Sequence, residues 1–351
     1  MHEGPKALII GAGIGGLTTS ILLAQKGYSV SVYEKNSSPG GRCGQLIRDG
    51  HRFDLGATML MMPGVYHEVF NLLGIELEEG KDILPLKDLY TIFFNDCSSL
   101  AFSPDTEKMN RQLEAIEPGS SARARDYVEK GYRIYNLGMN RLVSRNFYSL
   151  FQMVNLKNVP LLFQLKAFTP HYRYSKRFFK SESLRMAYTF QNIYVGQNPF
   201  DSPALFSMIP AAELTEGSFF PASGGMFNIV ERLLAEAGKL GVKIYYNNPV
   251  SRISIKDKKA MGIILSDGTA VGADLVVSNA DLPYTYRKLL PDRRKSAHIE
   301  KLKYSCSALC FHWGLDKVYP QLDQHNVFLS DNFREGLPKI FRDKSVGDNP
   351  C

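Results

Sequence analysis

The stretch Ala7-Leu8-Ile9-Ile10-Gly11-Ala12-Gly13-Ile14-Gly15-Gly16-Leu17 decides the fold of this chain. A short apolar strand runs into the pattern Gly11-x-Gly13-x-x-Gly16, and an apolar run with helical spacing follows through Ala24. In such a turn the first glycine permits the sharp bend, the second lets the backbone approach a pyrophosphate, and the third lets the helix pack closely on the strand. The helix N-terminus then directs its N–H groups at the phosphates. The stretch therefore predicts a dinucleotide-binding βαβ unit.

The residues that follow strengthen this prediction. Residues 28–34 read as a second parallel strand, after Gly27 ends the helix. Glu34 ends this strand at the spacing where an acid accepts hydrogen bonds from an adenosine ribose, and its charge disfavours a 2'-phosphate. After Lys35, the segment Gly40-Gly41-Arg42 suits a loop over a flavin pyrophosphate, with the arginine supplying charge. The alternative is that the glycine pair is only a flexible turn.

The run Gly11–Arg42, followed by Phe53-Asp54-Leu55-Gly56-Ala57-Thr58, resembles the N-terminal part of the FAD-dependent amine-oxidase superfamily. The resemblance implies that Glu34 binds ribose and that the Gly-Ala-Thr segment approaches the flavin. A plain NAD-binding domain is not expected to carry this second motif, so FAD is the predicted cofactor.

Composition places the chain among folded proteins. Its 351 residues are 44% hydrophobic and 22% charged, enough for two domains with substantial cores. The formal charge of +7 would suit nucleic acid or an anionic membrane surface. Because nothing resembles a nucleic-acid-binding module, we expect a membrane surface or no macromolecular partner.

The cysteines and the N-terminus indicate the compartment. The five cysteines lack the spacing of a zinc site or a disulfide framework, and Cys306 and Cys310 are predicted to be buried structural thiols. No metal site is expected. No secretory signal precedes the first strand, and no apolar stretch reaches the length of a membrane span. We therefore expect a cytoplasmic protein, peripheral on the inner face of the membrane.

Local patterns predict the further elements. We expect a helix over 65–77, a hairpin of strands 90–94 and 100–102, a charged helix over 105–135, and strands over 308–314 and 326–329, with His325 facing solvent.

The segment 136–180 is apolar and aromatic, and it ends in the basic-aromatic run 171–180. Aromatic rings interleaved with cations suit a membrane interface, where rings lie at headgroup depth and cations meet anionic lipid. They also suit a core helix with one solvated basic face. We give the two interpretations equal weight.

Three later segments narrow the resemblance. The runs 190–200, 217–226 and 248–253 are similar to the carotenoid desaturase family of the phytoene desaturase type. The resemblance implies that Gly224-Gly225-Met226 opens a helix of the flavin domain and that Val250 touches the adenine through its backbone. From their residue types, Asn279 and Asp281 are predicted to cap the helix that begins at Pro283.

The predicted fold is α/β, a Rossmann-like FAD-binding domain with an inserted α+β substrate domain. Residues 1–80 and 218–290 are assigned to the FAD-binding domain, and 81–217 and 291–351 to a substrate and membrane-associating domain. Family members continue beyond the equivalent of Cys351, so the chain is expected to be truncated at its C-terminus and its FAD binding weakened. The residues expected to bind the cofactor are Gly11, Ala12, Gly13, Ile14, Gly15, Gly16, Glu34, Lys35, Gly41, Arg42, Ala57, Thr58 and Val250.

The resemblance implies FAD-dependent desaturation of a carotenoid precursor such as phytoene, with hydride transfer to flavin N5 and reoxidation by oxygen or a quinone. An apolar tunnel from the 136–215 region would hold the long substrate. The sequence names no catalytic base. Alternatives are a related carotenoid or retinoid isomerase, saturase or oxygenase, or a flavin-free lipid-binding protein of the GDP-dissociation-inhibitor type.

Overall fold

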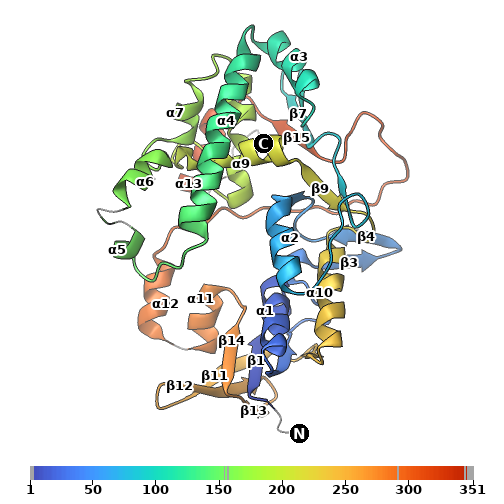
Figure 1. The fold of residues 1–351 in the computed structure, drawn as a ribbon, viewed down its shortest axis with the longest axis vertical. Helices are drawn as coiled ribbons and strands as arrows, with labels where there is room; N and C mark the ends of the chain where they lie inside the picture. Colours follow the sequence, from blue (N-terminus) through green and yellow to red (C-terminus); the bar gives the residue numbers. More distant parts are fainter. Residues whose placement is uncertain (1–3, 154, 156–157, 291, 344, 346–351) are drawn as a thin grey trace. The chain divides into compact units, whose positions relative to one another are not determined.

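A computed structural model of the chain describes residues 4–153, 155, 158–290, 292–343 and 345 (Figure 1). The chain forms two units, each made of two segments: unit 1 is Met1–Leu84 with Phe219–Lys303, and unit 2 is Pro85–Ser218 with Tyr304–Cys351. The sequence-based division ended the first domain at residue 290, whereas unit 1 also includes α12 (Arg293–Glu300). The chain passes between the units at β6 (Ile83–Pro85), β9 (Ser218–Pro221) and the segment after α12.

Unit 1 is built on a four-stranded parallel sheet in the order β10-β2-β1-β14. The bounds are β1 Lys6–Ile10, β2 Ser29–Tyr33, β10 Lys243–Tyr245 and β14 Leu275–Ser278. Helix α1 (Ile14–Gln25) connects the two central strands. The predicted strand, glycine turn, helix and second strand are confirmed.

Strand β1 is apolar throughout because both faces of its sheet are covered. On one face Ala7 and Ile9 pack against α1 and α10 (Phe227–Lys239), which lie side by side in Figure 1. On the other face Leu8 and Ile10 pack against the sheet β11-β12-β13. Successive side chains of a strand point to opposite faces, so both cores grow from one strand.

The remaining elements of unit 1 surround this sheet. Helix α10 begins after Gly224-Gly225-Met226, as predicted, and a turn at Asp267-Gly268 joins β12 to β13. The bounds are β3 Gln45–Arg48, β4 His51–Asp54, β5 Leu60–Met61, α2 Pro63–Leu72, β11 Val250–Lys256, β12 Lys259–Leu265, β13 Ala270–Gly272 and α11 Leu282–Tyr284.

Unit 2 combines a small sheet with helices. The sheet has the order β15-β7-β8, and its predicted strands are confirmed as β7 Tyr90–Phe94, β8 Ser99–Phe102 and β15 Asn326–Leu329. The helices are α3 Thr106–Ile116, α4 Ser120–Gly138, α5 Leu150–Met153, α6 Val159–Gln164, α7 His171–Ser175, α8 Glu182–Ala187, α9 Met208–Glu216 and α13 Phe333–Arg342.

The charged segment 105–135 is helical, as predicted, but it forms two helices. The chain breaks between α3 and α4 at Glu117-Pro118-Gly119. Glu117 is extended, Pro118 cannot donate the backbone hydrogen bond of a continuing helix, and Gly119, with φ +74°, is the N-cap of α4.

In the basic-aromatic run 171–180 the rings belong to the core and the cations to a solvated face, as the second of the two interpretations predicted. Its aromatic side chains Tyr172, Tyr174, Phe178 and Phe179 are buried, whereas its lysines and arginines are exposed. The rings of Tyr174, Phe178 and Phe179 pack at tilted or edge-on angles against Tyr127 of α4, so they are not available to a membrane.

Three predictions for the later chain are wrong. Residues 308–314 form no strand, because no described strand pairs with them, and the side chains of Leu309, Phe311 and Trp313 are exposed. Cys306 and Cys310, predicted to be buried structural thiols, are half-buried and exposed, respectively. His325, predicted to face solvent, is half-buried and its carbonyl accepts a hydrogen bond from the Thr91 N–H.

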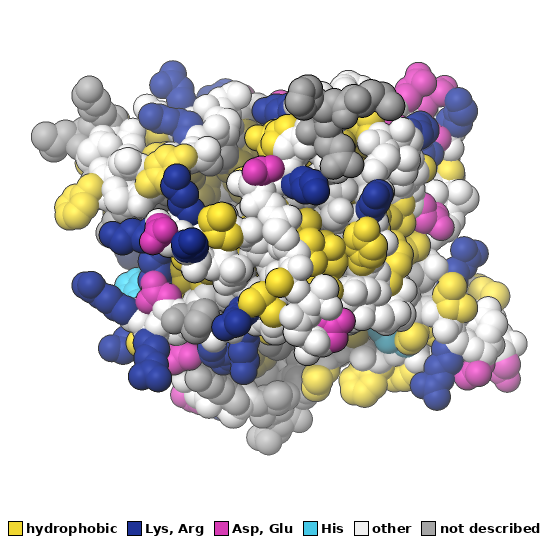
Figure 2. Space-filling view, turned by 90° about the horizontal axis from the view of Figure 1, so that it is seen from below, with side chains coloured by type: hydrophobic (Ala, Val, Ile, Leu, Met, Phe, Trp, Pro, Cys, Tyr) yellow, Lys and Arg dark blue, Asp and Glu magenta, His cyan; other side chains and the backbone are white. Residues whose placement is uncertain are grey.

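Among the described helices, none is both long and apolar enough to cross a bilayer. On the face shown in Figure 2, lysine and arginine side chains are spread among apolar and acidic ones.

The turn between β1 and α1 leads to a first prediction. A Cβ on Gly16 would lie 2.1 Å from the Gly11 carbonyl oxygen, so Gly16→Ala forces helix and strand apart. We expect a loss of about 1–3 kcal/mol in the free energy of unfolding, measured by urea titration.

Gly238→Ala is the matched control, because Gly238 lies in the last turn of α10 and a Cβ there meets nothing within 4 Å. It should not destabilise the chain, because alanine favours the helical conformation over glycine. Equal unfolding curves for the two variants would contradict the close approach.

Candidate functional site

Unit 1 contains a cavity of about 800 Å³ at the carboxyl ends of its parallel strands. Ligands of open α/β sheets bind at this edge, where loops from neighbouring strands converge. The lining residues come from the turn after β1, the end of β2, the 40–43 turn, the start of β11 and the segment after β14. The volume is within the range of cofactor sites.

The glycine turn exposes the start of α1 to this cavity. Gly11 has φ +98° and its N–H donates to the Tyr33 carbonyl at 2.8 Å, which ties the turn to β2. Gly13 is the N-cap of α1 and has no side chain to accept hydrogen bonds from the helix. The first N–H groups of this 12-residue helix are therefore available to an anionic ligand.

Asn279 lies against the same turn. A Cβ on Gly15 would lie 2.7 Å from its Oδ1, and one on Gly13 would lie 3.1 Å from its Nδ2. The prediction that Asn279 and Asp281 cap the following helix by their side chains is wrong. Asp281 occupies the N-cap position of α11 without a side-chain hydrogen bond, and its carboxylate is 3.5 Å from Arg42.

Glu34 joins the turn after β1 to the segment after β2. Its side chain is only 5% exposed, and its two oxygens accept hydrogen bonds from the N–H groups of Ala12 (2.8 Å) and Asn36 (2.9 Å). Each carboxylate oxygen has a second lone pair, so the group keeps the capacity to accept hydrogen bonds from a ligand. Ala12 is fully buried and does not line the cavity.

The 40–43 turn is held in place on both sides. The Gly40 N–H donates to the Ala12 carbonyl at 2.8 Å, and Gly40 and Gly41 have positive φ. A Cβ on Gly56 would lie 1.8 Å from the Arg42 carbonyl oxygen. The Arg42 side chain is 95% exposed and makes only a long ion pair of 3.5 Å with Asp281, so an anion in the cavity can compete for it.

Asp54 joins two motifs that are far apart in the sequence. Its carboxylate accepts hydrogen bonds from the N–H groups of Met226 (2.8 Å) and Phe227 (3.3 Å), at the start of α10. A Cβ on Gly225 would lie 2.4 Å from this carboxylate, which explains the glycine. The sequence showed both motifs but not their contact.

Cys43 faces the cavity as a protonated thiol. Burial, followed by the neighbouring Asp54 carboxylate, raises the pKa of the Cys43 thiol. Its Sγ lies 3.6 Å from the Met226 carbonyl oxygen. A raised pKa disfavours the nucleophilic thiolate, so the geometry gives Cys43 a packing role.

Most of the predicted site residues meet in this cavity. Those that line it are Gly11, Gly13, Ile14, Gly15, Glu34, Lys35, Gly41, Arg42, Ala57 and Val250. Gly16 is buried behind the turn, and Thr58 is exposed outside the lining. Sequence reasoning did not assign Tyr66, Met226, Asn279 or Tyr284 to the site, although the structure places them in its wall. Among the described residues, no group of His, Cys, Asp and Glu is placed to hold a metal.

The cavity fits an adenine dinucleotide. It combines a helix N-terminus without a capping side chain, an acid behind it and an exposed arginine beside it. These suit phosphates, a ribose and the charge of a pyrophosphate, respectively.

Comparison with known proteins identifies the class. Residues 14–341 match the family of flavin containing amine oxidoreductases. The chain is 37% identical over 347 residues to phytoene desaturase of Fusarium fujikuroi, covering 98% of this chain and 61% of that protein. It is 31% identical to 4,4'-diapophytoene desaturase (4,4'-diaponeurosporene-forming) of Staphylococcus haemolyticus, covering 97% and 69%. An oxidoreductase structure from Methanosarcina mazei has a TM-score of 0.56 at 20% identity, covering 84% and 64%.

The chain belongs to the flavin containing amine oxidoreductase family. Its resemblance to carotenoid desaturases is confirmed, as are the α/β fold and FAD as the cofactor. The chain spans about three fifths of the length of the first of these relatives.

Unit 2 holds a separate buried polar cluster around Glu213 of α9. The Tyr90 hydroxyl donates to the Glu213 carboxyl at 2.9 Å, and the Gln191 side-chain amide donates to the same hydroxyl at 2.8 Å. Burial raises the pKa of Glu213 to about 8, which the Tyr90 hydrogen bond only partly offsets. Glu213 is therefore a neutral acid at pH 7.

Glu34→Gln tests the carboxylate of the cavity. The amide keeps the shape but turns an NH₂ group toward one of the two backbone N–H donors. We expect FAD affinity to fall by about tenfold to a hundredfold, as a charged hydrogen bond contributes about 1.5–3 kcal/mol. Flavin fluorescence during titration measures it, and Glu300→Gln on exposed α12 should leave it unchanged.

Glu213→Gln tests the neutral acid. The folded-state pKa lies above the ordinary value of 4.5, so the folded chain binds more protons and its stability falls as pH rises from about 4.5 to 8. The variant should lose this dependence and exceed the original chain by about 3 kcal/mol at pH 7. Parallel stability curves from pH 4 to 8 would contradict a raised pKa.

Proposed function

We propose that this chain binds FAD in unit 1 and takes part in the desaturation of a long apolar carotenoid precursor such as phytoene. The observation that carries the proposal is 37% identity to a phytoene desaturase over 98% of the chain, through both units. Because the chain spans three fifths of that relative, activity, substrate and partners are proposals.

Each residue of the cavity takes a role in this proposal. The N–H groups of the Gly11–Gly16 turn receive the pyrophosphate, Glu34 accepts the adenosine ribose hydroxyls, and the Val250 backbone meets the adenine. Arg42, with Gly41 beneath it, adds charge over the pyrophosphate. Lys35 lies near the ribose, and the Ala57-Thr58 segment approaches the flavin ring. Ile14 lines the wall.

Desaturation removes a hydride and a proton from adjacent carbons, and no side chain can accept a hydride. FAD, held by the residues of the unit 1 cavity, would supply the two-electron acceptor, and oxygen or a quinone is the proposed final oxidant. The protein's part is to hold the polyene in place and exclude water. We assign no catalytic residue, and an apolar tunnel in the 136–215 region stays a prediction.

Peripheral membrane association follows from the substrate and from unit 2. A carotenoid precursor resides in lipid, and unit 2 exposes three large aromatic side chains between α5 and α7: Phe151, Phe163 and Phe168. Exposed aromatic residues on helical surfaces favour the membrane interface.

The alternatives differ in product or cofactor. A carotenoid or retinoid isomerase, saturase or oxygenase would use the same cavity and release a different product. A flavin-free protein of the GDP-dissociation-inhibitor type does not need an uncapped helix N-terminus together with Glu34 and an exposed Arg42, which favours the flavoprotein.

The test is expression of the chain in phytoene-accumulating cells, with pigment extracts separated by chromatography. We expect coloured products with extended conjugation, and the purified chain should show visible flavin absorbance. Unchanged phytoene beside a flavin-loaded chain would contradict phytoene desaturation but not the flavin site. Absence of flavin from the folded chain would contradict both.

A further inference from the structure

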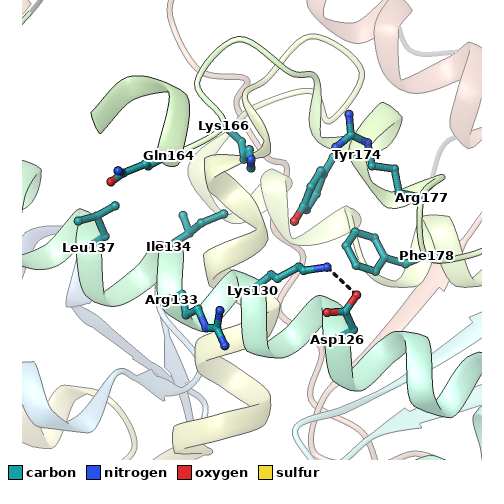
Figure 3. A pocket seen from close by; sticks show the side chains of 10 residues that line it. All are labelled: Asp126, Lys130, Arg133, Ile134, Leu137, Gln164, Lys166, Tyr174, Arg177 and Phe178. Carbon is teal, nitrogen blue, oxygen red and sulfur yellow. Dashed lines mark hydrogen bonds and ion pairs between the residues drawn. The ribbon is translucent and has the colours of Figure 1, made fainter. Parts of the chain in front are cut away.

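Unit 2 contains a second cavity, of about 530 Å³, between α4, the end of α6 and the segment from α7 to Phe178 (Figure 3). Four cations and one acid are among its lining residues, which gives it a net charge of +3. These residues are Lys130, Arg133, Lys166, Arg177 and Asp126. Its apolar wall includes Ile134 and Phe178, both buried.

The polar groups of the cavity converge. In Figure 3 the ends of Lys166, Tyr174 and Lys130 turn toward the same space. The Lys130 ammonium donates to Asp126 at 2.7 Å, which leaves two of its three donors for a ligand. Arg177 lies over the Tyr174 ring, 5.8 Å from its centroid, at the rim.

Tyr174 adds a neutral hydrogen-bond donor to the wall of the cavity. The residue is only 3% exposed, yet it is among the lining residues. In Figure 3 its hydroxyl points into the cavity. A tyrosine hydroxyl can donate a hydrogen bond to an oxygen of an anionic ligand bound there.

The backbone of Lys166 adopts an unfavourable conformation. It has φ +55°, the left-handed region that favours glycine, yet it carries a long charged side chain into the cavity. On either side of it in the sequence, Phe163 and Phe168 are 62% and 65% exposed, with ring centroids 5.1 Å apart. Cations beside exposed aromatic rings match a membrane surface, where rings lie at headgroup depth.

We propose that this cavity binds the phosphate of an anionic lipid headgroup while Phe163 and Phe168 enter the interface beside it. Lys130, Lys166 and the Tyr174 hydroxyl donate to the phosphate oxygens, and Arg177 adds charge at the rim. The inference rests on the membrane association proposed above and not on desaturation.

The test is co-sedimentation of the full chain with phosphatidylcholine vesicles, with and without phosphatidylglycerol. The triple variant Lys130→Gln, Lys166→Gln, Arg177→Gln should lose about a hundredfold in affinity for the anionic vesicles, since each cation contributes about fivefold. Its control, Lys256→Gln, Lys258→Gln, Lys259→Gln on the exposed β11–β12 hairpin, removes the same charge and should lose far less.

Two single variants separate a loss of lipid binding from a loss of folding. Lys166→Gly suits the positive φ, so it should be no less stable to urea while binding anionic vesicles about fivefold more weakly. Tyr174→Phe removes only the hydroxyl and should weaken anionic binding while leaving neutral binding unchanged.

The outcomes separate the two proposals. Binding to neither vesicle overturns membrane association itself. Equal loss in the cavity variant and the hairpin control, or binding to both vesicles alike, overturns the cavity as a headgroup site but not membrane association. Protection of the cavity by inorganic phosphate, without any preference for anionic vesicles, overturns the lipid as the source of the phosphate.

Discussion

The geometry of the cofactor cavity depends on close approaches of the main chain at glycines where a Cβ does not fit. Gly16 lies against the Gly11 carbonyl, Gly56 against that of Arg42, and Gly225 against the Asp54 carboxylate, all at distances where an added Cβ would overlap. These approaches leave the amide groups of the β1–α1 turn exposed to a ligand, and the carboxylate of Glu34 fixes them by binding the Ala12 N–H. The site is thus largely preformed by main-chain geometry.

The core of unit 2 contains many aromatic side chains that carry polar groups. The Tyr127 hydroxyl is hydrogen-bonded to His171 Nε2, and His171 Nδ1 is hydrogen-bonded to the Asn192 side-chain oxygen at 2.6 Å. Burial lowers the pKa of His171 to about 4, so this histidine is neutral at pH 7. Because rings and neutral groups fill the interior, the lysines and arginines of the same segments are left outside, where they create a basic cavity.

The two proposals share one physical reason. A carotenoid precursor is insoluble in water, so a protein that acts on it must contact lipid. A flavin site without such a contact would have no access to its substrate, and a basic cavity between exposed aromatic side chains provides one.

The sequence by itself determined the β1–α1–β2 unit, the Glu34 acid and the strands of the 90–102 hairpin, because each depends on local backbone preference and short spacing. Only the tertiary structure decided three further points: Asp54 caps α10 from 172 residues away, Asn279 covers the glycine turn, and the aromatic residues of 171–180 point inward. Residues 308–314 show the same limit, since an alternating pattern becomes a strand only with a partner. Local patterns specify the conformation of a segment, but its neighbours are chosen by packing across the whole chain.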